Sequence, residues 1–274
     1  MGLLFRLLAY LPLPVLHNIG ALLGWLVYGL SPTYRRHLRE NAAQAGLASA
    51  RRAAVAESGK TILELPRLWL RPHEEVVSRV VKVTGWEVVE QAWQAGRGIL
   101  FLTPHLGCFE ITAQYYAFRS KQAGQGPITV LYRRPKQAWL GPIIEEGRGA
   151  SLQLAPADMS GVRKLIKALK SGEAVGMLPD QAPGVGEGEW VPFFGRPAYT
   201  MTLAARLAKT GTTVILTYAE RLSYGAGYHQ RFLLPEGDVT TPAGVNREIE
   251  RLIRLCPGQY LWGYNRYKGR PPAP

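Results

Sequence analysis

The chain of 274 residues is long enough for one large α/β domain or for two small domains. Hydrophobic residues make up 47% of it and charged residues 19%, which excludes an intrinsically disordered chain and a membrane protein with many spans. A formal net charge of +13 predicts an anionic partner, unless it only reflects a basic proteome. The two cysteines, Cys108 and Cys256, are far apart and lack metal-ligand spacing, so we expect neither a bound metal nor a cofactor.

The first predicted element is an apolar stretch over residues 3–30, whose only charge is Arg6. Pro12 and Pro14 interrupt it, and the part after Pro14 is barely long enough to cross a bilayer. The prolines and the lack of a small-x-small cleavage site argue against a signal peptide. A buried core helix is the alternative, but we expect residues 1–33 to form a tilted or half-inserted membrane anchor.

Two basic segments fit an anionic partner. Residues 35–39 (RRHLR) directly follow the apolar stretch, and basic residues in that position stay on the cytoplasmic side and attract anionic lipids. Residues 162–170 predict an amphipathic helix whose basic face could dock an acidic carrier protein or the membrane. We therefore expect the body of the protein to be cytoplasmic and close to a membrane.

Behind the anchor, the sequence predicts alternating helices and strands. An Ala-, Arg- and Glu-rich helix over residues 34–70 should break or kink at Pro66, and a β-branched run covers 76–83. Strands are predicted at 98–103, 128–132, 174–178, 213–219 and 230–234, and helices at 87–94, 109–118, 139–146, 162–169, 201–208 and 245–255. This order predicts an α/β fold, with a mixed, mostly parallel sheet covered by helices on both faces. No linker divides it, so residues 34–274 should form a single domain.

The stretch LFLTPHLGCFE, residues 100–110, carries the candidate catalytic residues. Open α/β sheets bind ligands at the carboxyl ends of their strands, so His105, just after a predicted strand, falls where an active site belongs. If Glu110 lies one turn into the next helix, its carboxylate can hold one ring nitrogen of His105 and fix the tautomer. The other nitrogen can then deprotonate a hydroxyl group. The alternative is a capping histidine beside a solvated glutamate.

Other chemistries are less well supported. Cys108, three residues after His105, could serve a thioesterase as its nucleophile, although free cysteines more often fill the core. The glycine-rich residues 184–188 open no helix and predict a flexible loop rather than a nucleotide site. No recognisable nucleic-acid-binding motif appears, which disfavours nucleic acid as the partner. A non-catalytic basic module on a membrane is a further hypothesis.

Several ordered motifs resemble those of the bacterial lipid A late acyltransferases, the lauroyl- and myristoyl-transferring type. That family lies within the glycerolipid and lysophospholipid acyltransferase superfamily, which carries an HX4D/E motif. The resemblance runs from the apolar N-terminus to Pro271 and departs where an extra Arg134 precedes Pro135 and where Gln137-Ala138 replace Asn-Pro. The motifs are TPHLGCFE (103–110), YRRP (132–135), Gly147-Arg148, LPDQ (178–181), FFG (193–195) and PGQYLWGYNRYKGRP (257–271).

The resemblance implies an O-acyltransferase with His105 as general base and Glu110 as its partner. It implies an acyl carrier protein or coenzyme A thioester as donor and a hydroxyl group of a glycolipid, above all a lipid A precursor, as acceptor. It also implies a place on the anionic inner membrane of a bacterium, with the catalytic domain on the cytoplasmic side. Phosphatidylinositol mannoside, ornithine lipid and lysophospholipid are the alternative acceptors.

Further residues are candidates for binding substrate. Acyl transfer develops a negative oxygen that an arginine can stabilise, although each candidate arginine could instead be a solvated surface residue. The candidates for the oxyanion or the substrate are Arg133, Arg148, Asp180 and Gln181. Asp180 ends an apolar strand, so it could bind the acceptor or cap a turn. Phe193 and Phe194 suit a wall of an acyl-chain site, or ordinary core packing.

Overall fold

The computed structural model describes residues 2–132, 135, 137, 139–149 and 152–269. Its helices are α1 (Gly2–Leu8), α2 (Leu13–Leu30), α3 (Pro32–Gln44), α4 (Arg51–Leu70), α5 (His73–Val77), α6 (Glu87–Gln94), α7 (Phe109–Gln122), α8 (Leu140–Gly149), α9 (Met159–Lys170), α10 (Leu203–Ala208) and α11 (Pro242–Leu255). Its strands are β1 (Val80–Thr84), β2 (Ile99–Leu102), β3 (Ile128–Tyr132), β4 (Gln153–Pro156), β5 (Ala174–Met177), β6 (Gly188–Phe193), β7 (Arg196–Met201), β8 (Thr213–Arg221) and β9 (Tyr228–Leu233).

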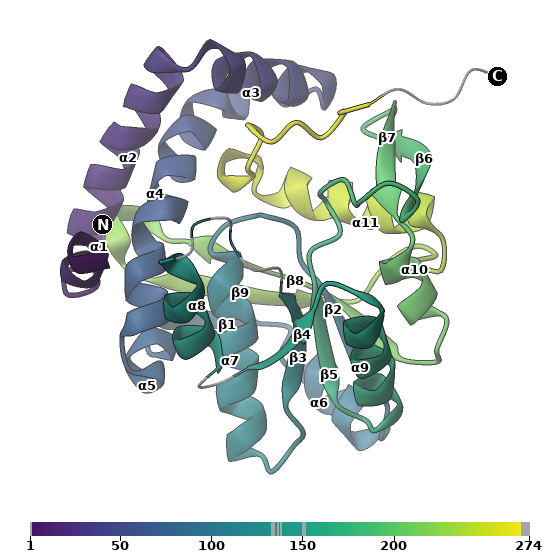
Figure 1. The fold of residues 1–274 in the computed structure, drawn as a ribbon. Coiled ribbons are helices and arrows are strands. Elements are labelled where there is room, and N and C mark those ends of the chain that lie inside the picture. Colours follow the sequence, from purple (N-terminus) through teal and green to yellow (C-terminus); the bar gives the residue numbers. More distant parts are fainter. Residues whose placement is uncertain (1, 133–134, 136, 138, 150–151, 270–274) are drawn as a thin grey trace.

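Seven of the strands form one sheet in the order β1-β9-β8-β2-β5-β3-β4 (Figure 1). The strands from β8 to β4 pair in parallel, whereas β9 runs antiparallel to β8 and parallel to β1. β6 and β7 form a separate antiparallel hairpin. The predicted α/β fold with a mixed, mostly parallel sheet is therefore confirmed.

The central strand β2 shows how helices cover both faces of the sheet. All of its residues are buried, and successive side chains of a strand point to opposite faces. Leu100 and Leu102 belong to an apolar cluster that includes residues of α9, α10 and α11. Ile99 and Phe101 belong to a second cluster, with residues of α6 and α7. A strand buried on both faces needs a continuous apolar run, which is why the sequence revealed it.

The N-terminal apolar helix α2 lies along α4 (Figure 1). Glycines bring the two backbones together: a Cβ at Gly59 would collide with the Gly20 carbonyl, and one at Gly24 with the Val55 carbonyl. The opposite side of α2 is apolar and exposed, with Leu22 71% and Leu30 75% accessible. Among the described helices, α2 alone is long and apolar enough to cross a membrane, by length and composition only.

Local predictions failed where packing overrides sequence pattern. The helix predicted over residues 34–70 is two helices, α3 and α4, and Pro66 lies inside α4 without ending it. The buried side chains of Leu68 and Trp69 pack into the core and hold this last turn in place. The β-branched run at 76–83 is divided between the end of α5 and the strand β1. The strand β4 and the hairpin β6–β7 were not predicted.

Candidate active site

Two neighbouring parallel strands bring the central side chains of the site together. Leu102, the last residue of β2, pairs with Met177, the last residue of β5. His105 follows the first strand by three residues, and Asp180 follows the second by the same number. The two side chains therefore meet at the carboxyl edge of the sheet, where open α/β sheets bind their ligands.

His105 is held by Asp180 at two points. The Nδ1 of the ring lies 2.8 Å from Asp180 Oδ1, and the backbone N–H of His105 donates to Asp180 Oδ2 at 3.0 Å. The side-chain amide of Gln181 contacts the other ring nitrogen, Nε2, at 3.2 Å. Because a carboxylate only accepts hydrogen bonds, these partners assign the proton to Nδ1 and leave Nε2 with its lone pair.

Asp180 stays ionised although it is 2% exposed. Burial alone would raise the pKa of its carboxyl group, but the electrostatic interaction with the His105 side chain and the hydrogen bonds from His105 outweigh burial and lower that pKa. The phenol of Tyr260 is also buried beside Asp180, and burial followed by that negative charge raises the pKa of Tyr260 far above its usual range. Asp180 is thus a fixed negative charge behind the imidazole.

The turn after His105 has a backbone that only glycine suits. Gly107 has φ of +60°, and a Cβ there would collide with the Ala219 carbonyl. Its N–H donates to the Gln259 carbonyl at 3.0 Å, and the Leu261 N–H donates to the His105 carbonyl at 3.1 Å. The C-terminal segment therefore fixes the turn that carries the imidazole.

A buried arginine holds the same turn from the other side. Arg221, at the end of β8, donates from Nη2 to the Gly107 carbonyl at 2.8 Å and to Thr61 at 2.8 Å. Its Nε and Nη2 also bind the carboxylate of Glu64 on α4. His17 on the apolar helix α2 contacts Glu64 at 3.2 Å. A chain of buried polar contacts thus connects α2, α4 and the His105 turn.

Glu110 is placed differently from the expectation that its carboxylate holds the imidazole. The structure gives that position to Asp180, whose carboxylate comes from a different strand. Glu110 lies in the first turn of α7, is 9% exposed, and accepts a hydrogen bond from the Trp69 indole at 3.1 Å. Its catalytic role stays a prediction.

Cys108 lacks the features of a reactive thiol. It is 1% exposed, and its N–H donates to the Ala219 carbonyl. Burial, followed by the negative charge of Glu64, raises the pKa of its thiol well above the usual range, so the thiol is protonated at neutral pH. This environment gives no support to a thioesterase with Cys108 as nucleophile.

The other predicted site residues fall in three places. Arg133 lies outside the described residues, and Arg148 lies in α8 with its side chain outside the described part. Phe193 and Phe194, at the tip of the hairpin β6–β7, are buried against aromatic residues of the C-terminal segment. The cavity beside Phe193 has a volume of about 10 Å³, which fits no more than a single water. The acyl-wall role of these phenylalanines stays a prediction.

Three residues next to the site were not predicted from the sequence: Trp69, Arg221 and Glu64. All of them act over long sequence separations, so no local pattern marked them. The LPDQ and PGQYLW motifs did mark the segments that carry Asp180 and Tyr260. Among the described residues, no cluster of histidine, cysteine or carboxylate side chains could hold a metal ion.

Comparisons with known proteins identify the family of the chain. The model of the bacterial lipid A biosynthesis acyltransferase family matches residues 2–269. The chain is 27% identical to the lipid A biosynthesis lauroyltransferase of Escherichia coli (strain K12), over 97% of this chain and 89% of that protein. It is 27% identical to the palmitoleoyltransferase of the same organism, over 95% and 87%. It is 24% identical to the myristoyltransferase, over 80% and 68%. The chain therefore belongs to the bacterial lipid A biosynthesis acyltransferase family and is an acyltransferase.

Proposed function

We propose that this protein transfers a fatty acyl chain from an acyl carrier protein or coenzyme A thioester to a hydroxyl group of a lipid A precursor. The observation that carries the proposal is the His105 ring, whose Nδ1 is bonded to a buried carboxylate while Nε2 keeps its lone pair. An imidazole in this state is the general base that a neutral hydroxyl needs. The names of the similar proteins, all lipid A acyltransferases, support the acceptor.

The reaction that this geometry supports has two proton transfers. The hydroxyl of the acceptor replaces the Gln181 amide at Nε2, and its proton moves to Nε2 as its oxygen attacks the thioester carbonyl carbon. Asp180 stabilises the resulting imidazolium. When the tetrahedral intermediate collapses, the carbon–sulfur bond breaks and Nε2 returns the proton to the departing sulfur. Arg133 and Arg148 are the proposed partners of the negative carbonyl oxygen.

We place the enzyme on the cytoplasmic side of the bacterial inner membrane, with residues 1–33 as its anchor and residues 34–274 as its catalytic domain. The exposed apolar side of α2 supports this location, because large apolar surfaces on a protein mark contacts with membranes or partners. Arg36 and Arg39 on the following helix are exposed and would face anionic lipids.

The first experiment tests the reaction itself. Purified enzyme is incubated with an acyl carrier protein or coenzyme A thioester and a lipid A precursor, and the lipid is analysed by mass spectrometry. We expect a product heavier by one acyl chain and no such product with His105→Ala. Release of free fatty acid without an acylated lipid would contradict acyl transfer.

A second experiment decides which carboxylate acts through His105. Asp180→Asn and Glu110→Gln are each combined with His105→Ala, and kcat/KM is measured for single and double variants. A residue that works through the imidazole adds little to the loss already caused by His105→Ala, because residues acting as a unit are not additive. We expect this behaviour from Asp180→Asn. Additive loss from Glu110→Gln would give Glu110 a separate role, whereas non-additive loss would support the predicted pair.

A further inference from the structure

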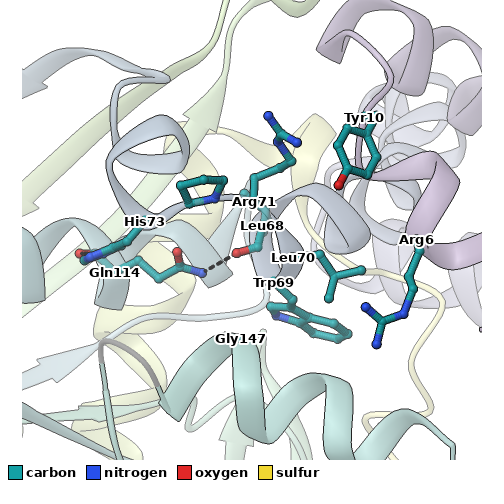
Figure 2. Close-up of a pocket in the computed structure, with 10 residues that line it drawn as sticks. Arg6, Tyr10, Leu68, Trp69, Leu70, Arg71, His73, Gln114 and Gly147 are labelled. Atoms are coloured by element: carbon teal, nitrogen blue, oxygen red, sulfur yellow. Dashed lines mark hydrogen bonds between the residues drawn. The ribbon is translucent and has the colours of Figure 1, made fainter.

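A cavity beside Trp69 takes no part in the reaction described above. It has a volume of about 410 Å³, a size typical of small-molecule sites. Its walls come from α1, from the end of α4, and from α5, α7 and α8 (Figure 2). Two guanidinium groups line it, those of Arg6 from α1 and Arg71 from the α4–α5 junction. Arg71 lies over the Tyr10 ring at 4.5 Å, which gives its side chain a defined direction.

The positive charge around this cavity exceeds the negative charge. Glu75 is the ion-pair partner of both Arg67 and Arg71, so one carboxylate serves two arginines. Arg6 forms no ion pair within the described part of the chain. Among the described residues that line the cavity are two guanidinium groups and no carboxylate. An anion bound here would meet unbalanced guanidinium groups.

The helix that carries Arg6, α1, is apolar and exposed. On α1, Leu3, Leu4 and Leu7 are 73%, 59% and 59% accessible, and Tyr10 beyond the helix is 71% accessible. Their spacing of three and four residues puts them along one side of the helix. A ligand whose anionic group enters the cavity therefore has a large apolar surface next to it, which suits a lipid better than a free ion.

The cavity also borders the motif that carries the candidate catalytic residues. Trp69 lines it, and the indole of the same residue donates to Glu110. Gln114, one turn after Glu110 on α7, lines it as well and donates to the Leu68 carbonyl at 3.0 Å (Figure 2). A group bound in the cavity thus contacts the helix that follows His105.

We propose that this cavity binds a phosphate group of the phosphorylated lipid that accepts the acyl chain, through Arg6 and Arg71. Guanidinium groups match phosphate oxygens with paired N–H donors, and the exposed apolar residues of α1 would contact the rest of the lipid. The acceptor part of this proposal rests on the proposed function. The binding part stands on the charges, the cavity and the exposed apolar residues of α1.

The kinetic test compares a phosphorylated acceptor with the same lipid after phosphatase treatment. Arg6→Gln and Arg71→Gln should each raise the KM for the phosphorylated acceptor about tenfold, the effect of a lost charge-assisted hydrogen bond. The KM for the thioester donor should stay within about twofold. With the dephosphorylated acceptor, wild type and variants should behave alike. Arg97→Gln, which removes the same charge from an exposed position between α6 and β2, is the matched control and should match the wild type.

Arg6→Gln breaks no ion pair with a described residue, so it keeps the test decisive if Arg71→Gln fails to fold. An unchanged acceptor KM in Arg6→Gln, or equal wild-type KM for the two lipid forms, would overturn the proposal. A rise in the donor KM alone would overturn it too, because the arginines would then serve the donor.

A binding test needs no catalysis and separates this proposal from the proposed function. Wild type, the Arg6→Gln/Arg71→Gln variant and the Arg97→Gln control are sedimented with phosphatidylcholine vesicles with and without about 10% phosphatidic acid. We expect the double variant, and not the control, to lose its preference for phosphatidic acid. If the double variant loses its preference for phosphatidic acid but the wild type transfers no acyl chain, only the proposed function is rejected. If the wild type transfers an acyl chain but the double variant keeps the preference, only the proposed phosphate site in the cavity is rejected. Loss of the preference when inorganic phosphate is added in small excess would show a site for the free ion and overturn the lipid proposal.

Discussion

Two pairs of a carboxylate and a nitrogen base lie on either side of the turn after His105, and they differ in how far their side chains are exposed. In the pair His105–Asp180, the histidine side chain is 18% exposed and the aspartate 2%. In the pair Arg221–Glu64, both side chains are 1% exposed. Both carboxylates have lowered pKa values although they are buried. The first pair can still reach a substrate, and the second cannot.

Hydrogen-bond saturation explains this difference. The three guanidinium nitrogens of Arg221 have partners in Glu64, Thr61, Glu57 and the Gly107 carbonyl, and Glu64 also accepts from the Tyr228 hydroxyl at 3.0 Å. A network satisfied in this way is rigid and costly to break. His105 Nε2 has only the exchangeable Gln181 amide among the described residues. The saturated pair thus holds a turn, and the unsaturated pair is free for the chemistry proposed above.

The largest expected effect falls on the unsaturated pair. His105→Ala should lower kcat/KM about 10³–10⁴-fold, about 4–5 kcal/mol of transition-state stabilisation, because the hydroxyl loses its base. The free energy of unfolding in urea should fall by about 1–3 kcal/mol, because the buried carboxylate of Asp180 loses one hydrogen-bond partner. His37→Ala, in the basic segment of α3, is the control and should keep full activity. Full activity of a folded His105→Ala enzyme would remove His105 from the mechanism.

Breaking the saturated pair should act mainly on stability. Arg221→Met leaves the buried Glu64 without its main partner and should lower the free energy of unfolding by about 3–5 kcal/mol. Arg231→Met, which removes an ion pair with Glu220 whose two side chains are 34% and 31% exposed, is the matched control and should cost under about 1 kcal/mol. Urea unfolding followed by circular dichroism measures both. Equal losses for the two variants would show that the buried network does not stabilise the fold.

Acid should remove the contribution of Glu64 without a mutation. Burial would raise the pKa of its carboxyl group, but the charge of Arg221 and the hydrogen bonds of His17 and Arg221 lower it to about 2. A carboxyl group whose folded pKa lies below its unfolded value stabilises the fold above the unfolded pKa, and this stabilisation is lost as the pH falls. With an unfolded pKa of about 4.3, the loss is about 3 kcal/mol between pH 4.3 and pH 2.

The measurement for this prediction is the free energy of unfolding between pH 5 and pH 3. In Glu64→Gln, the free energy of unfolding should depend less steeply on pH than in the wild type. The slopes should differ by the uptake of up to one proton on unfolding. Glu75→Gln, in a more exposed ion pair, should change the dependence less. An identical slope in wild type and Glu64→Gln would contradict the lowered pKa.

The smallest expected effect is that of Cys108→Ser. The thiol is buried and protonated, so its replacement should change the transition-state free energy by under about 1 kcal/mol. Cys256→Ser provides the comparison, because that cysteine is far from the motif in the sequence. An inactive Cys108→Ser enzyme, together with an acylated Cys108 peptide from the wild type, would favour a covalent mechanism in which Cys108, and not the His105–Asp180 pair, carries the central step.

The elements that the sequence predicted best are those whose own residues carry a clear local pattern. β3 and α6 have the expected bounds, and β2 differs by one residue at each end, because apolar runs and amphipathic periodicity are local signals. The hairpin β6–β7 carries prolines at 192 and 197 and has mixed exposure, so its strands lack that signal. Its pairing depends on contacts with α11 and the C-terminal segment, which no local pattern reveals.

For the site, the motif predicted His105 but the pairing was only partly foreseeable. The carboxylate at its ring nitrogen comes from a residue 75 positions away, and only the register of β2 against β5 brings the two together. The equal offset of three residues after each strand is visible in the sequence once that register is known. The pair Arg221–Glu64 spans 157 positions and has no local signature at all.

The glycine contact between α2 and α4 sets an order of events during synthesis. Gly24 leaves the ribosome about 35 residues before Gly59, a delay of about 2–7 s at ordinary translation rates. During that time the glycine side of α2 has no partner within its own chain, and an apolar helix in this state can only find lipid or a chaperone. Docking of α2 on α4 therefore follows the contact of α2 with lipid or a chaperone. A bulky residue at Gly24 would block the docking without affecting that earlier contact. With α2 as the proposed anchor, the nascent chain would reach the membrane and then fail to close its fold.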